Sequence, residues 1–190
     1  MVTALRTAPP ATVPESSLRA ALARLWIDHV LWTRQYIVAA VAGSPDAEAA
    51  AGRLLRNQED IGNAVVPFYG EEAGAALTTL LKDHIMIAVG IVAASLDDDE
   101  DAALAELARW DANADALAEL LAGANPENWP LDDVRDLLGQ HLALTKRELL
   151  ARLNDEWDDD IAAFDDILTE ILTMASALSE GLIAQFPDRF

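Results

Sequence analysis

The sequence contains no cysteine among its 190 residues. This absence excludes disulfide bonds, iron–sulfur clusters, thiolate zinc sites and thiol nucleophiles. The sequence also lacks the glycine-rich loop that holds phosphates in nucleotide-binding proteins, so we expect no nucleotide cofactor. It has no Glu-x-x-His motif and no two histidines three or four residues apart. The signatures of ferritin-like di-iron proteins and of His-Glu-x-x-His metalloproteases are therefore missing.

Long hydrophobic runs are scarce as well. The longest covers residues 85–96, IMIAVGIVAASL, and charged residues flank it at Lys82, Asp83 and Asp97. A helix needs about 20 apolar residues to cross a bilayer, so this run predicts a buried helix and no membrane insertion. The first residues also lack the charged segment and apolar stretch of a secretory signal. We therefore expect a cytoplasmic protein.

Positively charged residues are also few. Lysine and arginine total 13 against 33 aspartates and glutamates, a net charge of −20. Residues 97–170 alone hold 22 acidic and 5 basic residues. A surface this acidic repels phosphate backbones and argues against a nucleic-acid partner. It is typical of solubility or of adaptation to a salty cytoplasm, with a cation-attracting or partner-docking face as the alternative.

What is present favours helices. Apolar residues make up 52% of the chain, alanine and leucine dominate, and no segment alternates with the period of a strand. The proline-containing residues 1–14 predict a disordered arm. Helical patterns then cover about residues 15–42, 46–66, 71–95, 100–122, 131–153 and 156–186. Gly43-Ser44-Pro45, Pro67 with Gly70, and the loop 123–130 separate them.

The short connections predict an all-α, single-domain six-helix bundle. Three antiparallel helical hairpins, at about 15–66, 71–122 and 131–186, would form it. The first helix of each hairpin carries a similar segment: LWIDHVLWT, LLKDHIMIA and LLGQHLALT. Their histidines, His29, His84 and His141, are the only ones in the chain and lie 55 and 57 residues apart. This spacing predicts a pseudo-threefold internal repeat.

Helical spacing places each histidine on the apolar face of its helix, so each imidazole needs buried partners or a metal ion. Reflection of each hairpin about its turn brings a polar residue level with each histidine. For His29 this residue is Asp60. For the other two histidines the candidates are Asp111, Asn113 or Asp115, and Asp165 or Asp166, respectively.

The leading hypothesis is a metal-binding bundle, of which a small metalloenzyme would be one form. His29, His84, His141 and Asp60 would bind a divalent metal such as Zn, Fe or Mn, because imidazole and carboxylate suit these ions. The residues expected around the ion, as supporting contacts or alternative ligands, are Asn57, Asn113, Asp115, Glu148 and Asp165. The aromatic residues expected to line a pocket beside it are Trp32, Tyr36 and Trp110.

Two other hypotheses remain open. In the first, the histidines are hydrogen-bonded structurally in a non-catalytic bundle that binds a partner or an apolar ligand. In the second, their ionisation near pH 6 makes the protein responsive to pH. The expected partner is a metal ion or small molecule, and a homo-oligomer is compatible with the sequence.

Four segments, LWIDHVLWTRQYIVAA, RLLRNQEDIGNAVVPFYG, LLKDHIMIA and GLIAQFPDRF, resemble a family of uncharacterised bacterial and archaeal helical proteins. The resemblance runs from about Leu22 to the C-terminus and implies an all-helical fold. Some members carry the label of kinase or glycosyltransferase, but this chain has neither a nucleotide-binding loop nor an α/β pattern. The resemblance implies no activity and transfers no functional residues.

Overall fold

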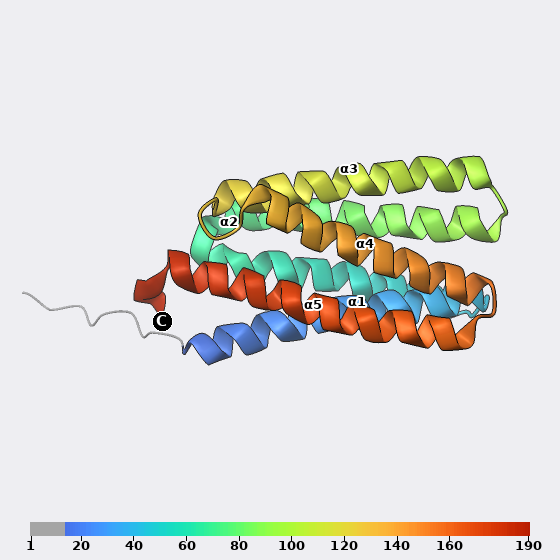
Figure 1. The fold of residues 1–190 in the computed structure, drawn as a ribbon, viewed down its shortest axis with the longest axis horizontal. Helices are drawn as coiled ribbons and strands as arrows, with labels where there is room; N and C mark the ends of the chain where they lie inside the picture. The colour runs from blue at the N-terminus through green and yellow to red at the C-terminus, as the bar shows by residue number, and fades with distance from the viewer. Residues whose placement is uncertain (1–13) are drawn as a thin grey trace, which may run out of the picture.

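A computed structural model describes residues 14–190 and places nearly all of them in helices (Figure 1). The elements are α1 (Glu15–Val41), α2 (Ala47–Leu96), α3 (Glu100–Ala124), α4 (Leu131–Leu153), α5 (Trp157–Gln185) and the short 3-10 helix η1 (Pro187–Arg189). The all-helical prediction is confirmed for this range. The predicted disordered arm, residues 1–14, lies outside the described residues except for Pro14.

Five α-helices are assigned within residues 14–190 where six were predicted, because the second and third predicted helices are joined across a kink into one 50-residue element, α2. Pro67 lies inside this helix and Gly70 has φ 86° and ψ 172°, a conformation that strongly favours glycine. The backbone is not helical at Gly70, so α2 consists of two helices that meet at a kink. Figure 1 shows that the halves of α2 on either side of the bend run in opposite directions, so each half pairs with a different neighbour.

Glycine also allows the two halves of α2 to touch beside the bend. A Cβ atom on Gly62 would lie 2.7 Å from the Gly74 carbonyl oxygen, and one on Gly74 would lie 2.8 Å from the Gly62 carbonyl oxygen. Any side chain at either position would therefore push the two backbones apart. The close contact explains how a kinked helix can work as a hairpin.

The helices pack in sequence order. The first half of α2 packs on α1, its second half packs on α3, and α4 packs on α5. α5 also packs on α1, and α4 on α3, which closes the bundle. The turns that follow α1, the second half of α2, and α4 all lie at one end of the molecule (Figure 1). Each contains a residue with positive φ: Gly43, Asp98 and Asp155.

The loop between α3 and α4 seals the opposite end of the core. Trp129 is 4% exposed, and its indole Nε1–H donates to the Ala177 carbonyl on α5 at 3.3 Å. Asn125, also buried, donates from Nδ2 to the Gly181 carbonyl at 2.9 Å. The loop between α3 and α4 is therefore bound to α5 through buried hydrogen bonds.

Two helices, α2 and α5, contain stretches long and apolar enough to cross a membrane by length and composition alone. Core helices of soluble proteins pass the same test, and in α2 and α5 39% and 50% of these stretches are buried inside the bundle. The cytoplasmic location and the absence of a membrane partner stay predictions.

Candidate functional site

The three histidines lie together inside the bundle. His29 on α1, His84 on α2 and His141 on α4 are 2–4% exposed. The ring centroids of His29 and His141 are 5.5 Å apart, and those of His84 and His141 are 6.5 Å apart. His141 therefore lies between the other two. We call these three side chains the histidine layer.

Each imidazole in the histidine layer has a hydrogen-bond partner at Nδ1 on the helix paired with its own. His29 Nδ1 lies 3.2 Å from Gln58 Nε2, His84 Nδ1 lies 2.9 Å from Asn113 Oδ1, and His141 Nδ1 lies 3.2 Å from Glu170 Oε2. Each partner follows its histidine by 29 residues. The second ring nitrogen, Nε2, is thus the one that remains available to a further ligand.

The partners fix the protonation of two rings. Asn113 donates from Nδ2 to the Leu80 carbonyl at 3.0 Å, so its Oδ1 must accept, and His84 carries its proton on Nδ1. The Glu170 carboxylate is an acceptor, so His141 in its neutral form also donates from Nδ1. In both rings Nε2 then holds a lone pair, the form in which imidazole binds metals.

The amide of Gln58 sets the protonation of His29. Gln58 Nε2 donates to the Leu54 carbonyl at 2.9 Å and lies near His29 Nδ1, while Gln58 Oε1 is buried without a hydrogen-bond partner. With the amide in this orientation His29 Nδ1 accepts, so the ring proton is on Nε2. Rotation of the amide would offer an acceptor to Nδ1, at the expense of the hydrogen bonds from Gln58 Nε2 to Leu54 and Asn57. Because the ring proton follows the partner, this rotation would give His29 the same lone pair on Nε2.

Burial keeps two of the histidines uncharged. Burial is the main reason that the pKa of His84 falls from 6.5 to about 3, with the neighbouring His141 adding to the effect. Burial likewise lowers the pKa of His29 well below 6.5, and the two nearby imidazoles lower it further. Both side chains are therefore neutral in the folded protein near pH 6, and no proton competes with a cation for them.

The predicted carboxylate ligands are not beside the histidines. Asp60 is exposed on α2, two residues beyond Gln58, which occupies the place expected for Asp60. Asp115 is exposed and bonds to Arg135, while Asp165 is exposed on α5. Reflection placed the partner of His29 two residues and that of His141 four or five residues from its observed position, enough to turn the aspartates of these two hairpins to the outside. Asp60 therefore does not lie beside the histidines in this structure.

Two predicted supporting residues, Asn57 and Asn113, are buried as expected. Asn113 bonds directly to His84, which confirms it as a partner of that histidine. Asn57 donates from Nδ2 to the Leu25 carbonyl on α1 at 3.0 Å and accepts from Gln58 Nε2 at 3.2 Å. It therefore supports Gln58 and holds α1 and α2 together.

Glu148 belongs to a separate buried ion network. It lies two turns after His141 on α4 and accepts from Arg34 Nη1. Arg34 also makes two hydrogen bonds to the Asp160 carboxylate, at 2.8 and 3.0 Å, and Arg152 donates to the same carboxylate at 3.3 Å. Burial raises the pKa of Glu148 to about 7, and the attraction of Arg34 offsets only part of this rise. Glu148 is thus engaged by an arginine instead of the histidine layer.

The three predicted pocket aromatics separate into two places. Tyr36 and Trp110 line one apolar cavity, and the Trp110 ring lies 5.0 Å from the His84 ring. Trp32 instead faces a surface cleft between α1 and α2. Trp32 and Tyr36 lie on the same helix as His29, but the Trp32 side chain points toward the surface cleft and away from the cavity that Tyr36 lines. The prediction of a single pocket beside His29, lined by all three aromatic residues, is therefore wrong.

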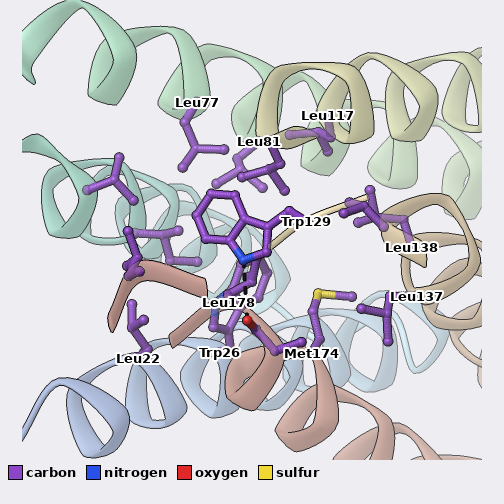
Figure 2. A pocket seen from close by; sticks show the side chains of 16 residues that line it. Leu22, Trp26, Leu77, Leu81, Leu117, Trp129, Leu137, Leu138, Met174 and Leu178 are labelled. Carbon is purple, nitrogen blue, oxygen red and sulfur yellow. Dashed lines mark hydrogen bonds between the residues drawn. The ribbon is translucent and has the colours of Figure 1, made fainter. Parts of the chain in front are cut away.

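Apolar cavities lie on both sides of the histidine layer. The cavity with Tyr36 and Trp110 has a volume of about 30 Å³. The other, about 50 Å³, lies among residues one or two helical turns before each histidine, including Trp26, Leu81 and Leu138. Figure 2 shows Trp129 reaching into it from the loop before α4. Ligand pockets usually measure about 300–1,000 Å³, so neither cavity accommodates an organic ligand.

Within residues 14–190, no three histidine, aspartate or glutamate side chains stand in an arrangement ready to hold a metal ion. The rings of His29 and His84 both lie close to that of His141, but the three do not form such an arrangement. Comparison with known proteins adds no relative: no family model, no curated protein and no solved structure matches the chain.

Proposed function

We propose that the protein binds one divalent transition-metal ion through Nε2 of His29, His84 and His141. The observation that carries the proposal is that each ring has a hydrogen-bond partner at Nδ1 while the ring of His141 lies 5.5 and 6.5 Å from the other two rings, centroid to centroid. Histidines that bind metals almost always use their second ring nitrogen in this way, since that bond fixes the ring and its proton.

The two ring separations that involve His141 support a site that closes on the ion. Zn–N bonds of about 2.0–2.1 Å put the ring centroids of two imidazoles on one tetrahedral ion about 5–5.5 Å apart. The His29–His141 separation of 5.5 Å meets this value, and the His84–His141 separation of 6.5 Å exceeds it by about 1 Å. The cavities on both sides of the histidine layer provide room for a ring movement of this size.

The charges around the site also favour a cation. Neutral imidazoles suit Zn, Fe and Mn ions, and the Glu170 carboxylate bonded to His141 offsets part of the ionic charge. Glu170 Oε1 is buried without a hydrogen-bond partner among the described residues. Three imidazoles leave a fourth position on a tetrahedral ion, as in catalytic zinc sites, where the ion activates water.

The same arrangement in all three hairpins supports the pseudo-threefold repeat. In each hairpin, a histidine on the first helix bonds to a residue 29 positions later on the second helix. A repeat of this kind places three equivalent side chains near one axis. Three copies of one hairpin sequence would then provide the three histidines of the site.

The test begins with protein that a chelator has stripped of metal. Titration calorimetry with Zn²⁺, Fe²⁺ and Mn²⁺ should give about one ion per chain for at least one of them. Saturation at about 100 times the dissociation constant should stabilise the fold by about 3 kcal/mol. Co²⁺ should give the intense visible spectrum of a tetrahedral site, a readout that needs no variant.

The matched pair of variants is His84→Gln and Asp60→Asn. The first removes a proposed ligand and should abolish stoichiometric binding, whereas the second changes an exposed carboxylate and should leave binding intact. Circular dichroism checks that both are folded. Stripped wild-type protein that is fully folded, and that none of the ions binds or stabilises, would refute the proposal and leave the histidines as structural residues.

A further inference from the structure

A surface cleft of about 770 Å³ lies between α1 and the first half of α2. Its walls include Arg24 and Trp32 from α1, and Arg53 and Arg56 from α2. The volume is in the range of pockets that bind small molecules. The cleft is distinct from the histidine layer, because its residues lie on the outer side of α1 while His29 points inward.

The carboxylates of the cleft are already engaged. Asp28 accepts from Arg24 Nε at 2.9 Å and lies 3.7 Å from Arg53 Nη2. Asp46 accepts from the Ser44 hydroxyl. No acidic group in the cleft is therefore left without a donor, so the cleft is poorly suited to a cation.

The arginine donors, in contrast, exceed their acceptors. Arg53 Nη1 is buried and has no hydrogen-bond partner among the described residues. Arg56 lines the same cleft, and within residues 14–190 it lies near the exposed Glu59 without a side-chain contact as short as an ion pair. Arg24 and Arg53 share the single carboxylate of Asp28, so part of their positive charge is not balanced inside the cleft. The chain has only 13 basic residues, so three arginines in one cleft of an acidic protein favour an anion locally.

Aromatic and apolar surface lies beside these donors. The Trp32 ring is partly exposed, and the Arg53 guanidinium carbon lies 5.4 Å from its centroid. Leu31, on the same wall, is 45% exposed. A planar group can stack on the indole or the guanidinium while its charged end reaches the arginines.

We propose that this cleft binds an organic anion, a planar aromatic group that carries a phosphate or a carboxylate. Arg53 and Arg56 would bind the anionic end, Trp32 would stack on the ring, and Asp28 would hold Arg24 and Arg53 in position. The inference does not depend on metal binding.

Binding is measured by titration calorimetry, with tryptophan fluorescence in support. The probes are 1-naphthyl phosphate, 1-naphthoate, 1-naphthol and inorganic phosphate. At least one naphthyl anion should bind one per chain with a dissociation constant below about 1 mM, and naphthol and inorganic phosphate should bind about tenfold more weakly. The ratio between the two naphthyl anions tells which charged group is preferred. Binding should weaken when salt is raised from about 0.05 to 0.5 M.

Three variants locate the site. Arg56→Gln and Trp32→Leu should each weaken binding of the better naphthyl anion about tenfold, the loss expected for one charge-assisted bond or one stacked ring. Arg109→Gln removes an exposed arginine of α3 outside the cleft and should leave binding unchanged. No saturable binding of either naphthyl anion, or equal binding by wild type, Arg56→Gln and Trp32→Leu, would overturn the proposal. Binding of 1-naphthol as tight as that of the naphthyl anions would also overturn the proposal, because it would show that the cleft recognises only the apolar ring.

Discussion

Replacement of Glu148 by glutamine tests how the buried ion network responds to pH. Burial raises the pKa of this carboxyl from 4.5 to about 7 in the folded protein. A raised pKa means that the folded state favours the protonated form. The contribution of Glu148 to stability is then fully present below pH 4.5 and is lost as the pH rises through 7. Glutamine has no charge to gain, so Glu148→Gln removes this dependence.

The size of the effect follows from the two pKa values. Each unit of difference between the folded and unfolded pKa corresponds to about 1.4 kcal/mol, so 4.5 against about 7 gives about 3 kcal/mol. The Glu148 side chain is 1% exposed, so solvent screens little of this energy. The unfolding free energy of wild type relative to Glu148→Gln should therefore fall by about 3 kcal/mol between pH 4.5 and 8.

The assay is urea unfolding of both metal-free proteins at several pH values in this range. The control is Glu180→Gln, a change at an exposed glutamate of α5 whose charge is hydrated in the folded protein. The opposite slope would mean that the attraction of Arg34 outweighs burial, and no slope would mean that the two cancel. Either result contradicts our reasoning. Carbon NMR of the Glu148 carboxyl gives the folded pKa directly.

Two further predictions concern packing and the histidine partners. In thermal unfolding, Gly181→Ala should destabilise the fold by about 2 kcal/mol or more, because the added Cβ would lie 2.0 Å from the Trp129 indole nitrogen. The control, Gly123→Ala, should be neutral or slightly stabilising, because Gly123 has open space around it. Asn113→Ala should cost about 3 kcal/mol in urea unfolding, because it leaves His84 Nδ1 without its partner; a loss below about 1 kcal/mol would show that water replaces the amide.

Most of the fold follows from the sequence because its helices are long and their stops are strong. Gly43 and Asn154 bound helices that begin and end within one or two residues of the predicted positions. The two helices predicted on either side of Pro67 and Gly70 are both present, but they follow each other directly as α2, with Gly70 outside helical geometry. Local signals predict a change of direction there, and the chain does reverse at this kink.

The site was only partly predictable, for a geometric reason. The inward direction of His29, His84 and His141 follows from helical periodicity alone. Their partners depend on the register between two helices, which the position of a turn fixes only within a few residues. Gln58 and Glu170 were missed for this reason. The signal that could have found them is the constant spacing: once Asn113 is paired with His84, the same 29-residue separation gives the other two.

The positions of the chain reversals have a consequence for protein engineering. Three reversals, at Gly43, Asp98 and Asp155, share one end of the bundle, and longer loops there should cost little, since loop closure grows only slowly with length. At the other end, the two halves of α2 touch through Gly62 and Gly74, and the α3–α4 loop is locked to α5 by Trp129. Grafted peptides, tags or fused domains belong at the first end, because the second is part of the packed interior.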